Sequence, residues 1–200
     1  KPTLEKELNW SETDYSFIVM CFTASYALGL LAFGKVIDKI GSKMGYAISI
    51  VIWSFAAMAH ALAKTSFGFG AARAALGAGE AGNFPAAIKT VAEWFPKRER
   101  ALATGIFNSG ANIGAMVAPI MVPWILGAYG WQEAFIITGA IGFVWLALWW
   151  IFYEIPSKHT SVTKGELAHI QSEEETSEVA PIAWGKLFGY RQTWVFIVGK

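Results

Sequence analysis

Two charged residues, Arg73 and Glu80, interrupt a stretch of sequence that otherwise holds apolar and small residues. A separation of seven residues is close to two turns of an α-helix, so both side chains lie on one face, with about 10.5 Å between their α-carbons along the axis. Because helical side chains lean toward the N-terminus, Arg73 leans away from Glu80 and a direct ion pair within the helix is not expected. Each charge therefore needs a partner on another helix, in water or in a bound ion.

The chemistry of these two groups suits an organic anion and a proton. A guanidinium group stays charged at any physiological pH, and its planar fork binds a carboxylate through two hydrogen bonds. We therefore predict that Arg73 contacts a substrate carboxylate and that Glu80 exchanges a proton, both within one water-filled cavity. In the alternative interpretation, fixed partners in a helix bundle satisfy both charges, which then only orient the helices.

Small residues on the same stretch predict close helix packing. They recur at every fourth position and form a ridge that lets a neighbouring helix approach, at Gly70, Ala74, Ala78 and Gly82. Gly77 and Gly79 are expected to leave open space between the two charges. Pro85 is expected to kink the end of the helix.

Three further polar residues in apolar stretches are candidates for substrate binding. Asn108 and Asn112 lie one turn apart on a common helix face, where amides either bridge helices or hydrogen-bond a polar ligand. Tyr26 needs a partner for its hydroxyl group, although ordinary packing accounts for it equally well. His60 is expected near a membrane interface.

The composition predicts an all-α membrane protein. Hydrophobic residues make up 54% of the chain and charged residues only 16%, and the mean hydropathy is +0.41, whereas soluble domains are about a quarter charged. A net charge of +1 gives no reason to expect a nucleic-acid partner. One cysteine, Cys21, allows no disulfide within the chain, and neither a metal-ligand cluster nor a nucleophile–base pair is readable, so no metal, cofactor or enzymatic activity is expected.

Five apolar runs have about the length that a helix needs to cross a bilayer. They cover residues 15–33, 46–62, 67–88, 101–126 and 134–152, and a sixth begins at Trp194. Ten lysines and arginines fall in segments 34–45, 96–100 and 153–192. Three fall on the other side: Lys1 and Lys6 in the opening segment, and Lys64. The positive-inside rule therefore places these three segments in the cytoplasm, in a multi-pass protein of the inner (plasma) membrane.

The segment between the first and second apolar runs resembles a motif of a known family. Gly34, Asp38, Lys39, Gly41 and Lys43 match the G-x-x-x-D-[RK]-x-G-x-[RK] loop of the major facilitator superfamily, in which this loop acts as a conformational latch. In the residues themselves, a glycine at the first position allows close helix contact and the aspartate can pair at a neighbouring helix end.

A second resemblance narrows the family to its anion:cation symporter branch, and within it to bacterial hexuronate transporters. It is carried by Arg73 to Gly82, Trp94 to Arg100, and Gly130 to Phe135. It implies a helical bundle in which this chain covers transmembrane helices 2–6 and the start of helix 7. It also implies that Arg73 either binds the substrate carboxylate or gates the cavity, and that Glu80 takes part in proton coupling. Tyr26, Asn108 and Asn112 match positions that line the sugar-acid cavity.

The chain is then expected to be a segment of a longer protein. Residues 1–152 form an N-terminal transmembrane bundle without its first helix, 153–192 a cytoplasmic linker, and 193–200 the start of a C-terminal bundle. The linker either contains an amphipathic helix around Lys164–Glu175 or is mobile, and its acidic run is expected to be a solvated face. The remainder of the chain and the lipid bilayer are the expected partners.

The predicted function is proton-coupled symport of a sugar acid, a hexuronate or related organic anion, by alternating access. Two alternatives keep the fold and change the cargo to another carboxylate or the coupling ion to sodium. A hypothesis of another class is a membrane sensor of organic anions, which the absence of a readable signalling motif in residues 153–192 disfavours.

Overall fold

The protein is described here by a computed structural model that covers residues 2–172, 186 and 189–198. Within these residues every regular element is helical. The α-helices are α1 (Pro2–Leu8), α2 (Glu12–Ile40), α3 (Ser42–Ala59), α4 (Ser66–Glu80), α5 (Asn83–Trp94), α6 (Arg100–Tyr129), α7 (Trp131–Phe152), α8 (Lys164–Ile170) and α10 (Arg191–Val198). Two short 3-10 helices span His60–Leu62 and Pro156–Lys158.

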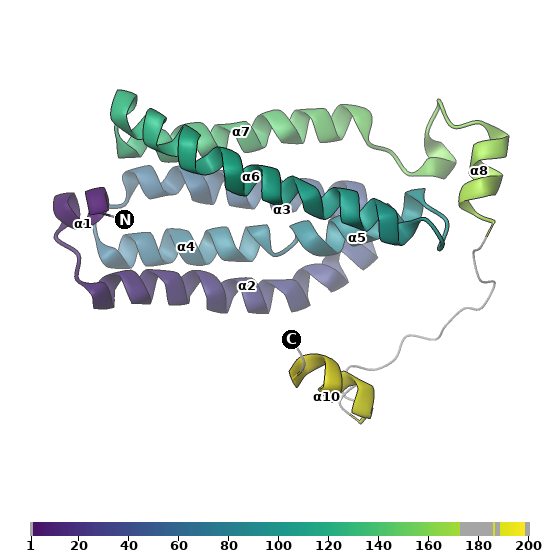
Figure 1. Ribbon diagram of the computed structural model, residues 1–200, viewed down its shortest axis with the longest axis horizontal. Coiled ribbons are helices and arrows are strands. Elements are labelled where there is room, and N and C mark those ends of the chain that lie inside the picture. The colour runs from purple at the N-terminus through teal and green to yellow at the C-terminus, as the bar shows by residue number, and fades with distance from the viewer. Residues whose placement is uncertain (1, 173–185, 187–188, 199–200) are drawn as a thin grey trace.

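The long helices run side by side as one bundle (Figure 1). Helix α4 packs between α2 and α3, and α7 covers another side of α3, whereas α6 packs mainly on α7 and α5. In the described part of the chain, four helices are long and apolar enough to cross a membrane: Glu12–Ile40, Ser42–Leu62, Arg100–Tyr129 and Trp131–Phe152. These four coincide with four of the five predicted spans.

The third predicted span is not one continuous helix. It divides into α4 and α5, which follow one another along the bundle, and the break falls at Ala81 and Gly82 (Figure 1). Pro85, in the first turn of α5, has no backbone N–H to donate to the carbonyl of Ala81, so the hydrogen-bond ladder is interrupted there. The structure therefore shows a helix break near Pro85 instead of the predicted kink.

The predicted loop 34–45 is also helical, which corrects the sequence-based expectation. Gly34, Asp38 and Lys39 lie on the last turns of α2, and Lys43 lies on the first turn of α3. Gly41 alone separates the two helices, with φ of +85°, a conformation that side chains other than glycine rarely adopt. The polar composition of this segment thus reflects a helical hairpin beyond the apolar core and not a loss of helix.

Basic residues gather at the end of the bundle that carries Gly41, which we name the basic end. The connection 96–100 is a short turn at this end, as expected.

In residues 153–192, α8 begins at Lys164, where Thr163 and Glu166 form a capping box. Hydrogen bonds from the backbone and side chain of Thr163 hold the pKa of Glu166 below its usual value. The acidic run at residues 173–178 lies outside the described residues, and the division into two bundles and a linker stays a prediction.

The predicted small-residue ridge of α4 packs on α2. A Cβ atom added at Gly70 would lie 2.7 Å from the ring of Phe17, and one added at Gly82 would lie 2.6 Å from the ring of Phe33. The expectation of open space at Gly77 and Gly79 is wrong. A Cβ at Gly77 would lie 2.5 Å from the backbone oxygen of Phe22, and one at Gly79 would lie 2.7 Å from the backbone nitrogen of Trp53. Helix α4 is thus held tightly, and this close packing positions Arg73.

Candidate functional site

Arg73 lies on α4 and lines a cavity of about 550 Å³, a volume typical of small-molecule sites. The guanidinium is partly buried. Helices α1, α2, α4, α6 and α7 contribute to the wall, which is mostly apolar and aromatic: Leu4, Trp10, Tyr15, Ile18, Val19, Phe22, Phe69, Val122, Leu126, Trp131, Ala134, Phe135 and Thr138. One permanent positive charge therefore faces a largely apolar cavity with few other polar groups.

The remaining polar groups of this cavity were not identified from the sequence. Tyr15 interacts electrostatically with Arg73. The hydroxyl of Thr138 donates to the carbonyl of Ala134 at 2.8 Å, so its oxygen can still accept a hydrogen bond. The indole N–H of Trp10 is buried without a hydrogen-bond partner among the described residues. The positions of Trp10 and Tyr15 before or at the start of an apolar run gave no sign of a binding role.

Glu80 lies two turns further along α4 than Arg73, on the last turn before the break. It interacts electrostatically with Arg73, yet it does not line the same cavity, and its side chain is exposed in the described bundle. The two charges thus share a helix face, while the structure does not enclose them in one pocket. The role of Glu80 stays a prediction.

His60 lies in the interior and not at an interface, which corrects the sequence-based expectation. Its exposed fraction is 0%, and its ring stacks on Phe135 with centroids 4.9 Å apart. Because a carbonyl oxygen only accepts, Nδ1 carries the hydrogen of the 2.7 Å bond to Ala56. Phe135 and Phe69 separate this imidazole from the open part of the Arg73 cavity, since both rings contact His60 and line the cavity wall.

The other predicted binding residues do not line the Arg73 cavity. Tyr26 is partly buried on α2 and stacks on Phe22, a cavity residue, with centroids 5.7 Å apart. Asn108 and Asn112 are exposed on α6, more than two turns from the α6 residues that reach the cavity. The structure therefore brings Tyr26 near the cavity and leaves the two amides apart from it.

At the basic end, the motif residues contact neighbouring helices. The ammonium of Lys89 donates to the carbonyl of Ile37 at 2.9 Å and lies 3.4 Å from a carboxylate oxygen of Asp38, so it caps the end of α2. Lys43 forms a 2.9 Å ion pair with Glu154, just after α7. Lys39 is exposed.

Close helix contact in this segment occurs at Gly45 rather than at Gly34. A Cβ added at Gly34 would meet nothing within 4 Å, whereas one at Gly45 would lie 2.7 Å from Ile37.

Glu93 joins three elements at the basic end. One of its carboxylate oxygens accepts hydrogen bonds of 2.5 Å from the hydroxyls of Ser42 and Tyr153. Burial and the hydrogen bond to Glu93 raise the pKa of Tyr153 to about 12. The start of α3, the end of α5 and the end of α7 are thereby tied together.

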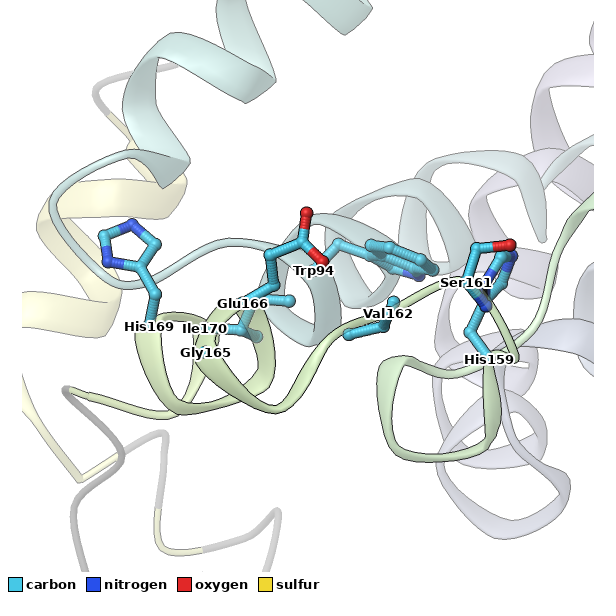
Figure 2. A pocket seen from close by; sticks show the side chains of 8 residues that line it. All are labelled: Trp94, His159, Ser161, Val162, Gly165, Glu166, His169 and Ile170. Atoms are coloured by element: carbon cyan, nitrogen blue, oxygen red, sulfur yellow. Dashed lines mark hydrogen bonds between the residues drawn. The ribbon is translucent and has the colours of Figure 1, made fainter.

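A second cavity lies between α5 and the segment around α8 (Figure 2). Its volume is about 540 Å³, and it is lined by Trp94, His159, Ser161, Val162, Gly165, Glu166, His169 and Ile170. His169 Nε2 lies 2.9 Å from Glu99 Oε1 and joins α8 to the turn before α6. The described residues hold no group of three or more His, Cys, Asp or Glu side chains that could bind a metal ion.

Comparison with known proteins identifies the family. The model of the Major Facilitator Superfamily matches residues 1–199. The hexuronate transporter of Escherichia coli (strain K12) is 40% identical over 197 residues, which cover 96% of this chain and 46% of that protein. The galacturonate transporter of Dickeya chrysanthemi is 39% identical over 179 residues, 90% of this chain and 52% of that protein. The chain thus spans about half the length of the curated relatives it matches.

A solved structure supports the fold. The bacterial homolog of the human lysosomal transporter Spinster, in an inward-facing and occupied conformation, superposes with a TM-score of 0.62. The match covers 78% of this chain and 39% of the chain of that transporter. Because the two sequences are 21% identical, the likeness concerns the fold alone. The relatives are named as transporters and not as enzymes. The family model, the two relatives and the apolar helices together show that this chain belongs to the Major Facilitator Superfamily, as a multi-pass membrane protein.

Proposed function

We propose that the full protein is a secondary active transporter of a hexuronate or related sugar acid, and that Arg73 binds the substrate carboxylate. The observation that carries this proposal is the partly buried guanidinium in the wall of a cavity of about 550 Å³. A charge-assisted, bidentate hydrogen bond is strengthened where water is excluded. The names of the two relatives, which specify hexuronate and galacturonate, support this substrate class.

The rest of the cavity suits a sugar acid. Small-molecule sites combine apolar walls with a few polar groups that fix orientation. Tyr15, Thr138 and the indole N–H of Trp10 supply such groups around Arg73. We propose that they hydrogen-bond the hydroxyl groups of the sugar, and that Tyr26, one turn beyond Phe22 on α2, contributes at the edge of the cavity.

Glu80 is proposed to carry the coupled proton. Its electrostatic interaction with Arg73 supports this role, because an anion that binds the guanidinium changes the free energy of the carboxylate two turns away. Its exposure on the described bundle leaves the carboxyl group open to water or to the other half of the protein. Asn108 and Asn112, exposed on α6, are proposed to face that second half and the substrate between the halves.

The orientation and the conformational cycle are proposed from the basic end. Lysine and arginine gather there, which supports a cytoplasmic location for this end and for segments 34–45, 96–100 and 153–192, with the protein in the inner membrane. Alternating access by rocking of two bundles requires contacts that form in one state only. The segment from Gly34 to Lys43, with Asp38, Lys39 and Gly41, is proposed to act as this latch.

Uptake by liposomes that contain the full-length protein tests the proposal. Labelled galacturonate should accumulate when a proton gradient is applied. Arg73→Ala should abolish both binding and uptake, whereas Glu80→Gln should abolish uphill accumulation and spare counterflow exchange. Lys64→Gln, an exposed residue at the opposite end of the bundle, serves as the control.

Each outcome decides a separate part of the proposal. Unchanged uptake by Arg73→Ala would remove Arg73 from the substrate site. Persistent uphill accumulation by Glu80→Gln would remove Glu80 from proton coupling. Specific binding of galacturonate without any movement across the bilayer would favour a sensor over a transporter.

A further inference from the structure

An apolar groove runs between α3 and α7, and it shares no lining residue with the Arg73 cavity. Its volume is about 610 Å³ and its lining is almost entirely hydrophobic: Met44, Ala47, Ile48, Val51, Ile52, Phe143, Leu146, Ala147, Trp150 and Ile151. Along α3 it extends from Met44 to Ile52, eight helical steps or about 12 Å at the rise of 1.5 Å per residue. A groove of this form in membrane-crossing helices accommodates an extended hydrocarbon chain.

At the basic end the groove continues into a small charged pocket. This pocket has a volume of about 280 Å³ and is lined by residues that include Gly41, Lys43, Glu154 and Lys158. Met44 and Trp150 line both spaces. The groove and the pocket therefore form one site that is apolar along its length and charged at one end.

Aromatic residues mark the junction of the two spaces as a membrane interface. The ammonium of Lys43 lies 5.5 Å from the centroid of the Trp150 ring. The indole N–H of Trp149 donates to the carbonyl of Lys43 at 3.1 Å, and that of Trp145 donates to the hydroxyl of Tyr46 at 3.2 Å. Tryptophan and tyrosine concentrate at the level of lipid headgroups, so the charged pocket lies at headgroup depth.

The side chains that line the pocket carry one net positive charge. Lys43 and Lys158 are cationic, and both interact electrostatically with the carboxylate of Glu154. Glu93 does not line the pocket, and its carboxylate is held by Ser42 and Tyr153. A phosphodiester, which carries one negative charge, would neutralise this set of groups.

We propose that one anionic phospholipid binds at this site, with an acyl chain in the α3–α7 groove and its phosphate between Lys43 and Lys158. The first turn of α3 adds to the anion site, because Gly41 provides no side-chain cap for its backbone N–H groups. Basic pockets between transmembrane helices at the membrane surface are suited to anionic headgroups. The site is independent of the proposed substrate cavity, since neither lining includes Arg73.

Native mass spectrometry of the full-length protein tests this proposal, with phosphatidylglycerol and phosphatidylcholine of the same acyl chains as probes. The wild-type protein should retain phosphatidylglycerol in preference to phosphatidylcholine. Lys158→Gln should weaken phosphatidylglycerol binding about fivefold and leave phosphatidylcholine unaffected. Ala147→Trp, which fills the groove without changing a charge, should weaken the binding of both lipids.

Lys97→Gln is the matched control, because it removes the same charge from the basic end at an exposed position outside the site. An equal loss of phosphatidylglycerol from Lys97→Gln and Lys158→Gln would overturn the proposal in favour of general surface charge. The proposal would also be overturned if neither Lys158→Gln nor Ala147→Trp changed the amount of phosphatidylglycerol retained. That result is expected if another segment of the full protein fills the groove. Because Lys158 is exposed, its substitution keeps the test valid even if Ala147→Trp fails to fold.

Discussion

The close approach of α2 and α4 allows a quantitative test of how Arg73 is positioned. A Cβ atom at Gly77 would lie 2.5 Å from the carbonyl oxygen of Phe22, so α2 itself must move to accept it. Overpacking costs about 1–3 kcal/mol, and the upper half of this range applies because the contact is with backbone. The higher helix propensity of alanine returns about 1 kcal/mol. Gly77→Ala should therefore lower the free energy of unfolding by about 1–2 kcal/mol.

Gly34→Ala is the matched control for this substitution. Both glycines are helical, but a Cβ at Gly34 would meet nothing within 4 Å, so only the gain of up to about 1 kcal/mol in helix propensity remains. Thermal unfolding of the full-length protein in mild detergent measures both variants. The melting temperature of Gly77→Ala should fall by about 2–8 °C, at about 2–4 °C per kcal/mol. A melting temperature at or above that of the wild type would refute the packing argument.

Three further predictions concern the basic end. Lys89→Met removes the ammonium that caps α2 and should lower the free energy of unfolding by about 1 kcal/mol, measured by thermal unfolding. The hydrogen bond from Lys43 holds the pKa of Glu154 below its usual value of 4.5. The ionised Glu154 should therefore stabilise the fold above pH 4.5, and this stabilisation should disappear as the pH falls through the pKa of Glu154 in the folded state. Melting temperatures measured as a function of pH should show this loss in the wild type and not in Glu154→Gln. Glu99→Gln should weaken the 2.9 Å contact with His169 and accelerate amide hydrogen exchange in α8.

Each of these predictions has a contradicting result. Equal stability of Lys89→Met and the wild type would show that the cap is dispensable. Parallel pH profiles for the wild type and Glu154→Gln would remove the ion pair with Lys43 from the stability of the basic end. Unchanged exchange in α8 after Glu99→Gln would show that other contacts hold this helix.

The sequence predicted the membrane-crossing helices well because their signal is local. Apolar runs near residues 15–33, 46–62, 101–126 and 134–152 correspond to the long helices α2, α3, α6 and α7. The break between α4 and α5 was harder to predict, because a proline in an apolar run can kink a helix or end it. The helical hairpin at Gly41 was missed since polar residues outside the bilayer resemble a loop whether or not they are helical.

The candidate site was predicted only in part, because cavity walls depend on packing between distant segments. Arg73 stood out as a charge in an apolar run, and the structure places it in a cavity wall. Thr138 and Tyr15 reach the same cavity from other helices, and nothing in their local sequence distinguishes them. The burial of His60 depends likewise on contacts with Phe69 and Phe135, which lie on two other helices.

The contact between Arg73 and a substrate carboxylate can be isolated by comparing two ligands that differ in that group. Galacturonate carries a carboxylate where galactose carries a hydroxymethyl group, so calorimetric titration of the full-length wild type and Arg73→Ala with both sugars completes a thermodynamic cycle. The wild type should prefer galacturonate by about 10- to 100-fold, the value of a charged hydrogen bond, and Arg73→Ala should lose this preference. A preference for galacturonate that survives the substitution, or an equal weakening of both ligands, would contradict the assignment of Arg73 to the substrate carboxylate.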